Sequence, residues 1–140
     1  MANITASQVN ELRQKTGVGM MDCKKALVAC DGDMEAAIEH LRKTGMAKAE
    51  KKAGRSATQG IFVSLVKGNV GTIIELLCET DFVAKTDAFK AFGAGVAEKV
   101  INEFADNGDI SEKLATTMQN ELKELIAKIG ENMHLRRAVR

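Results

Sequence analysis

Apolar residues recur every three or four positions through the first part of the chain, in three runs separated by glycine. Spacing of this kind gathers the apolar side chains on one face of a helix. Thr5 and Gln8 have the spacing of a capping box, which predicts that the first helix begins after Thr5. Asp33 is a suitable N-cap for the third helix, and Gly45 is a suitable end. The pattern predicts a compact three-helix bundle over residues 1–45.

Residues 46–58 follow, with many Ala and Lys residues and little apolar periodicity. In the overlapping segment 42–55, six basic side chains stand against a single acidic one, Glu50. A basic run of this kind can contact RNA, although a solvated helix face is the commoner outcome. We predict a solvated, helical, basic linker over 46–58 that breaks at Gly54.

The pattern changes to that of β-strands at residue 61. Residues 61–67 and 70–78 are rich in Ile, Val, Leu, Phe and Thr, and Gly68 with Asn69 between them is a two-residue hairpin signal. Both faces of the second strand are largely apolar. We therefore predict a central strand that helices cover on one side and that is partly covered on the other.

Helical spacing returns after the hairpin. Thr86 or Asp87 is expected to cap one helix, and Ser111 is expected to cap a further helix over 111–129. Residues 133–140 then alternate between apolar and polar side chains, which predicts a third strand.

These elements add up to an α+β fold with a three-helix bundle, a basic linker and a core subdomain over residues 59–140. In the core subdomain, two helices cover a hairpin-led sheet whose third strand lies at the C-terminus. The composition is ordinary for a globular protein, at 45% hydrophobic and 28% charged. The net charge is +1, and the chain has no Trp or Tyr and five Phe. These values give no electrostatic argument for binding DNA or a membrane, and no aromatic platform for single-stranded nucleic acid.

The sequence also bears on location and redox state. No apolar run reaches the roughly 18 residues that span a bilayer, and the N-terminus has neither the basic nor the apolar region of a signal peptide. Cys23 and Cys30 fall on one predicted helix, about 10.5 Å apart along its axis, which is too far for a disulfide. With Cys78, they are expected to be reduced thiols in a cytoplasmic protein.

Motifs of enzymes and of metal or phosphate sites are not evident in this sequence. The two histidines, His40 and His134, have no Cys or His at ligand spacing. Asp81 and Asp87 could be drawn as a carboxylate pair, but nothing near them supplies a nucleophile. We therefore expect a binding protein rather than an enzyme, with no cofactor and no metal.

The most informative stretch is the short loop over 79–86, between the second strand and the next helix. It carries Phe82 beside Asp81. Leaving a Phe side chain in water costs roughly 1.5–3 kcal/mol relative to full burial. The position of this ring in a loop therefore calls for an explanation. Either it folds back and fills the gap between strand and helix, or it is held out for a partner. The Gly-flanked apolar loop over 17–21 poses the same choice between internal packing and an exposed contact surface.

Three stretches of the sequence, over 19–27, 80–84 and 128–132, resemble the elongation factor Ts family, the bacterial guanine-nucleotide exchange factors for elongation factor Tu. The similarity extends over nearly the whole chain. It implies that residues 1–45 form a domain like the ubiquitin-associated (UBA) domain, and that residues 59–140 form the N-terminal half of the family's core. It also implies that this chain does not bind the nucleotide directly.

The resemblance further implies roles for particular residues. Phe82 would enter an apolar cleft on the G domain of elongation factor Tu, with Asp81 beside it, near the bound Mg²⁺ and phosphates, and GDP would leave. Thr80 and Val83 complete this exchange loop. A second group would dock on another helix of the same G domain, namely Arg13, Met20, Met21 and Lys24.

Members of the family are typically longer, so the resemblance implies either a fragment or an unusually short member. From the residues alone, a second class stays open, a small adaptor or RNA-associated module that uses the three-helix domain and the basic segment 42–55. GDP should weaken a complex with the G protein and leave an adaptor complex unchanged. An RNA complex should instead weaken steeply with salt.

Overall fold

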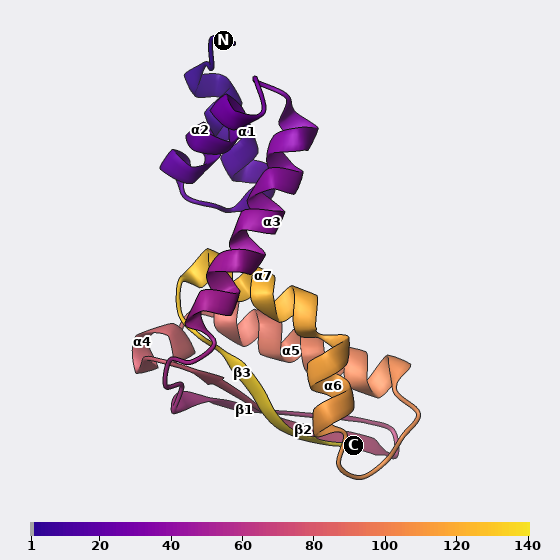
Figure 1. The fold of residues 1–140 in the computed structure, drawn as a ribbon. Coiled ribbons are helices and arrows are strands. Elements are labelled where there is room, and N and C mark those ends of the chain that lie inside the picture. The colour runs from indigo at the N-terminus through magenta and orange to yellow at the C-terminus, as the bar shows by residue number, and fades with distance from the viewer. Residues whose placement is uncertain (1) are drawn as a thin grey trace. The chain divides into compact units, whose positions relative to one another are not determined.

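The computed structural model describes residues 2–140, which divide into two compact units (Figure 1). The first unit consists of the residues up to Lys51 together with Lys123–Gly130, and the second of Lys52–Leu122 together with Glu131–Arg140. The chain therefore crosses between the units three times, whereas the sequence pattern placed one boundary region at 46–58. Over residues 2–140 the structure contains seven helices and one antiparallel three-stranded sheet, so the fold is mixed helix and sheet.

The first unit begins with helices α1 (Ala6–Thr16) and α2 (Met20–Ala29). The predicted capping box is confirmed, because the Gln8 amide donates to Thr5 Oγ1 at 3.2 Å and the Thr5 amide donates to Gln8 Oε1 at 2.9 Å. Such a box satisfies two backbone donors that the first turn of a helix leaves unpaired. The small core of the unit is formed by Val9, Leu12, Cys23, Ala26, Leu27, Ala37 and Leu41.

The third helix, α3 (Met34–Lys52), corrects a prediction. Asp33 caps it as expected, with the Ala36 amide donating to Asp33 Oδ1 at 2.9 Å, but Gly45 does not end it. A Cβ atom at Gly45 would lie 3.1 Å from Cβ of Ala127, a contact tighter than most real ones. Glycine here allows two helices to approach closely within the first unit.

Residues 46–52 of the predicted linker form the last part of α3, and residues 53–58 lie beyond the helix. Ala49 is buried, and two ion pairs tie this part of the helix down within the first unit. Lys48 Nζ lies 3.2 Å from Asp22 Oδ2, and Lys123 Nζ lies 3.2 Å from Glu50 Oε1. The predicted helical character is confirmed for residues 46–52, and most side chains of 46–58 are exposed as expected, with Ala49 as the buried exception.

The sheet of the second unit has the order β1-β2-β3, with strands β1 (Gln59–Lys67), β2 (Val70–Cys78) and β3 (His134–Val139). The hairpin turn at Gly68 and Asn69 is confirmed, and Gly68 has a φ of 62°, which favours glycine. The predicted third strand is also confirmed, and it pairs antiparallel with β2. The central position of β2 agrees with its apolar sequence.

One face of this sheet packs against helix α5 (Asp87–Glu103), and the buried side chains of β2 on that face include Ile74, Leu76 and Cys78. At Gly93 of α5, an added Cβ would lie 2.8 Å from Val63 Cγ2, so glycine allows this close packing. On the opposite face of β2, Glu75 and Leu77 are half-buried and Ile73 is exposed, which agrees with the predicted partial cover. The large exposed hydrophobic side chains on this face of the sheet are Phe62, Val66, Ile73 and Val139.

Of the two caps expected for α5, the structure has Thr86, since the Phe89 amide donates to Thr86 Oγ1 at 3.3 Å. The next helix corrects a prediction. The predicted helix over 111–129 is interrupted at Met118, so it forms α6 (Ser111–Thr117) and α7 (Gln119–Ile129).

Ser111 is also not the cap of α6. It is the first helical residue, and it donates to the carboxylate of Asp109 from both its amide, at 2.9 Å, and its hydroxyl, at 2.6 Å. These hydrogen bonds favour the ionised carboxylate and hold the pKa of Asp109 below its usual value. The side chain that organises this helix start therefore lies two residues earlier than the sequence pattern suggested.

Candidate functional site

The loop expected between β2 and α5 contains a single helical turn, α4 (Asp81–Ala84). Thr80 is its N-cap, in an extended conformation, and its Oγ1 accepts a hydrogen bond from the Val83 amide at 3.3 Å. Ala84 is buried and holds the end of the turn against the unit. The turn therefore has a defined start and an anchored end, although it is only four residues long.

Phe82 lies in the middle of this turn, and 80% of the residue is exposed. It does not fill a gap between the strand and the helix, so the first of the two readings of the sequence is wrong for residues 2–140. Asp81 is also exposed, and its Oδ2 lies 3.3 Å from Lys85 Nζ one turn later. An apolar ring and a carboxylate thus project side by side from a short, capped turn.

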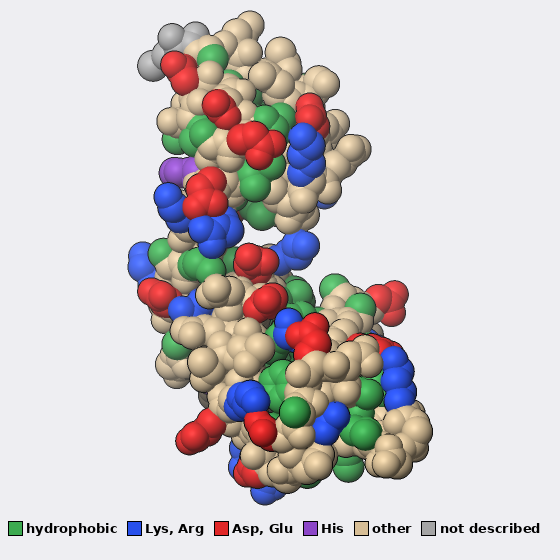
Figure 2. All heavy atoms as spheres, turned by 90° about the vertical axis from the view of Figure 1, so that its right-hand side faces the viewer, with side chains coloured by type: hydrophobic (Ala, Val, Ile, Leu, Met, Phe, Trp, Pro, Cys, Tyr) green, Lys and Arg blue, Asp and Glu red, His purple; other side chains and the backbone are tan. Residues whose placement is uncertain are grey.

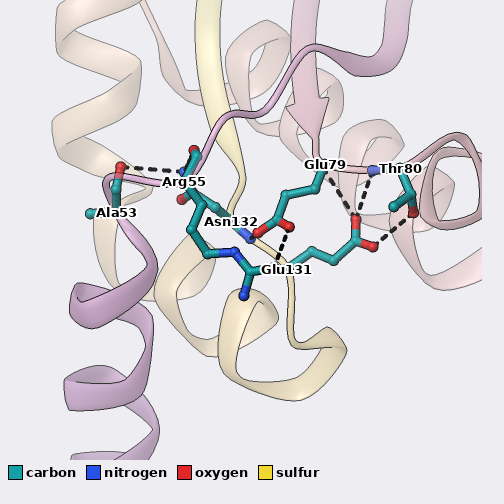
Figure 3. A network of polar contacts seen from close by, with 6 residues as sticks. All are labelled: Ala53, Arg55, Glu79, Thr80, Glu131 and Asn132. Atoms are coloured by element: carbon teal, nitrogen blue, oxygen red, sulfur yellow. Dashed lines mark hydrogen bonds and ion pairs between the residues drawn. The ribbon is translucent and has the colours of Figure 1, made fainter.

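The carboxylate of Glu131 accepts three hydrogen bonds from the two residues that precede the turn, Glu79 and Thr80 (Figure 3). Glu131 Oε1 accepts from the Glu79 amide at 3.2 Å and from the Thr80 amide at 3.0 Å. Glu131 Oε2 accepts from the Thr80 hydroxyl at 2.7 Å. One side chain from the segment before β3 therefore holds the backbone at the end of β2.

A second carboxylate, that of Glu79 at the end of β2, accepts from the segment before β3. Glu79 Oε1 accepts from the Asn132 amide at 2.7 Å, and Glu79 Oε2 lies 2.8 Å from Arg55 Nη2. The side-chain amide of Asn132, which is 1% exposed, donates to the carbonyls of Ala53 at 3.3 Å and of Arg55 at 2.7 Å. Figure 3 shows how these side chains converge between the end of β2 and the start of β3. No role was assigned from the sequence to Glu79, Glu131 or Asn132, because no local sequence pattern pairs positions that lie more than fifty residues apart.

The second predicted group, Arg13, Met20, Met21 and Lys24, lies in the first unit, and all four residues are exposed. The two methionines open helix α2 rather than forming a loop, and Met21 is 64% exposed. Val28 on the same helix is also exposed and was not predicted. The structure thus brings the four predicted residues onto one unit, while the group from Thr80 to Val83 belongs to the other.

Figure 2 shows acidic and basic side chains interspersed over one face of the molecule. Two further kinds of feature are absent from residues 2–140. No cluster of three or more His, Cys, Asp or Glu side chains there could hold a metal ion. In the same range, no helix has the length and apolar character needed to cross a membrane.

Comparison with known proteins finds relatives of one kind. The family model described as "Elongation factor TS" matches residues 79–140. The chain is 53% identical to an elongation factor Ts of Tolumonas auensis, over 99% of this chain and 49% of the relative. It is 54% identical to an elongation factor Ts of Idiomarina loihiensis, over 96% of this chain and 47% of the relative. The chain is similar to elongation factor Ts over nearly its whole length. It spans about half the length of the curated relatives it matches.

The part matched by the elongation factor Ts model begins at Glu79 and so includes the turn α4, Glu131 and Asn132. The similarity to elongation factor Ts relatives extends further and takes in nearly the whole of this chain, including the exposed residues of α1 and α2. Both groups of predicted site residues therefore lie in regions that the elongation factor Ts relatives share in overall sequence.

Proposed function

We propose that this chain acts in translation elongation as a guanine-nucleotide exchange factor, binding elongation factor Tu in its GDP form and promoting GDP release. The observation that carries the proposal is the 80% exposure of Phe82 on a capped turn. Leaving such a ring in water costs roughly 1.5–3 kcal/mol relative to full burial. A partner cleft that buries the ring would recover this free energy.

In the proposed mechanism, the ring of Phe82 enters an apolar cleft of the partner, with Asp81 beside it, near the Mg²⁺ and the phosphates of the bound GDP. Thr80 and Val83 shape the turn that carries them. The chain does not touch the nucleotide. It holds a conformation of the partner that binds GDP poorly, so GDP and the chain weaken each other's binding reciprocally.

The first unit supplies the second part of the proposed interface. We propose that its three helices form a UBA-like domain, and that Arg13, Met20, Met21 and Lys24 dock on another helix of the same G domain. Flexible methionine side chains suit a contact surface of this kind, and the flanking Arg and Lys would add favourable charge contacts at its rim.

The test is the release of fluorescently labelled GDP from elongation factor Tu, in a chase with unlabelled GDP, with and without this chain. We expect the chain to increase the release rate in a saturable way. No acceleration at a large excess of the chain would overturn the proposal. A complex with RNA that weakens steeply as salt rises, and ignores GDP, would favour the RNA-associated alternative instead.

A further inference from the structure

The turn α4 is too short to hold its own shape. Isolated helices shorter than about 12–15 residues are marginal in water, and α4 has four residues. Phe82 adds little to its stability, because most of the side chain lies in solvent. The direction in which the ring points therefore depends on the contacts that fix the backbone around it.

At the start of the turn, those contacts converge on Glu131. Its carboxylate accepts from the amides of Glu79 and Thr80 and from the hydroxyl of Thr80. Hydrogen bonds to an ionised acceptor are stronger than those between neutral groups. A single side chain thus satisfies three donors at the point where β2 leads into α4.

The contact with the Thr80 hydroxyl does more than hold Thr80 in place. A hydroxyl has one hydrogen to donate and lone pairs that accept. The donor of Thr80 is directed to Glu131, which leaves its oxygen to accept from the Val83 amide at 3.3 Å. Glu131 therefore orients the cap of α4 into the role that the turn requires.

Glu131 is itself held in a defined position. Gly130 ends α7 with a φ of 90°, a conformation that favours glycine, and the chain turns there toward β3. The next residue, Asn132, is buried and bonded through its amide to Glu79 and through its side chain to the backbone at Arg55. The carboxylate is thus presented by a backbone that has few alternatives.

We propose that Glu131 is a positioning residue that sets the direction of the Phe82 ring by holding the start of α4. The inference rests on the exchange function proposed above and deepens it. Glu131 does not touch the partner in this scheme. It acts through its hydrogen bonds at Thr80, which raise the fraction of chains in which the turn is ordered and Phe82 is in position to bind.

Other contacts at α4 do not involve Glu131. Cys78 Sγ donates to the Thr80 carbonyl at 3.1 Å, and the Thr86 hydroxyl donates to the Val83 carbonyl at 2.7 Å. Ala84 is buried at the end of the turn. The substitution Glu131→Ala should therefore loosen the turn without unfolding the sheet.

The first experiment is independent of any partner. Amide hydrogen exchange is measured by NMR on the 140-residue chain and on Glu131→Ala. We expect exchange at Thr80 and Val83 to become at least tenfold faster, with the amide of Ile74 in β2 unchanged. Unchanged exchange at Thr80 and Val83 would overturn the proposal, and so would equal acceleration at Ile74, which would mean general unfolding.

The second experiment measures GDP release from elongation factor Tu. If the ordered turn falls to about one chain in ten, the apparent potency should fall about tenfold. Glu131→Gln keeps a carbonyl oxygen for the two backbone donors, so its potency in GDP release should stay within about threefold of that of the unmodified chain.

A double mutant tests whether Glu131 acts through Phe82. In a Phe82→Ala background, Glu131→Ala should cause no further loss of GDP release, because the ring that Glu131 positions is already absent. A full additional loss in that background would overturn the proposal.

Glu75→Ala is the matched control. Glu75 is another half-buried glutamate of the second unit, on β2 six residues before α4, and its carboxylate pairs with Arg136 at 3.2 Å rather than with the turn. It should lower the melting temperature and leave the rate per folded molecule unchanged. If the unmodified chain fails to accelerate GDP release, the proposed function fails, while the hydrogen-exchange result still decides whether Glu131 orders the turn.

Discussion

At the scale of single residues, truncation of Phe82 distinguishes a side chain that binds a partner from one that stabilises the fold. An aromatic anchor at an interface costs about 2 kcal/mol or more when it is truncated to Ala, which is roughly thirtyfold in binding. We expect Phe82→Ala to remove most of the stimulation of GDP release and to change the melting temperature little, because the side chain is exposed. Asp81→Ala should have a smaller effect in the same direction. The measurements are the GDP release rate and the melting temperature of the same samples.

Phe62→Ala is the control for this prediction, since Phe62 lies in the same unit and is 75% exposed, but on the face of the sheet opposite α5. It should leave GDP release unchanged. The reading of Phe82 as an anchor would be refuted by a loss of stability of the size seen for core Phe residues, about 3–5 kcal/mol, with exchange activity following only the folded fraction.

The three cysteines provide a second test at this scale. Cys23 and Cys78 are buried, and Cys30 is half-buried. Burial raises the pKa of the Cys78 thiol, so at pH 8 it stays protonated and reacts slowly. We expect brief alkylation at pH 8, read by mass spectrometry, to label Cys30 first. Reducing and non-reducing gels should show equal mobility. Early labelling of Cys78, or a faster oxidised monomer, would contradict these assignments.

At the scale of elements, α3 shows how packing overrides a local stop signal. Glycine in a helix interior costs roughly 0.5–1 kcal/mol relative to Ala, so Gly45 is a reasonable helix end in sequence terms. In the structure, Gly45 instead allows close approach to Ala127, and the helix continues to Lys52. Buried Ala49 on the continuation adds to the packing of the first unit.

The extent of α3 predicts where a protease cuts first. Both side chains are ion-paired, Lys48 with Asp22 and Arg55 with Glu79, but Lys48 is helical, whereas Arg55 lies beyond the helix in an exposed, non-helical stretch. Because trypsin requires an extended backbone, we expect the first cleavage near Arg55 rather than after Lys48. The cut site is read from the masses of the early fragments. First cleavage after Lys48 would mean that the last turns of α3 open readily in solution.

At the scale of the whole molecule, the chain spans about half the length of its elongation factor Ts relatives. A chain with fewer residues available for contact should bind elongation factor Tu more weakly than the Tolumonas auensis relative does. At large excess it should still accelerate GDP release, because both predicted contact groups are present. Titrating both proteins in one release assay gives the comparison. Equal potency would show that the rest of the relative contributes little.

Several features of the fold follow from the sequence alone because they depend on neighbours within a few residues. The capping box at Thr5 and Gln8, the cap at Asp33 and the hairpin turn at Gly68 are confirmed. A hydrogen bond across three residues, or a positive φ at one glycine, is encoded where it occurs. The exposed Phe82 could be named as a candidate for the same reason, since an aromatic beside an acid at a strand end is visible locally.

Other features were decided only by the tertiary structure, because they join segments far apart in the chain. The reciprocal contacts of Glu79 and Thr80 with Glu131 and Asn132 link positions more than fifty residues apart, and no local pattern pairs them. The exposure of Phe82 also required the structure, since the sequence allowed the ring to fold inward equally well. Which side chain lies buried, and which carboxylate reaches which amide, depends on the packing of the whole unit. The sequence determined that there is a turn with an aromatic residue, and the tertiary structure determined that the turn is held and the ring is free.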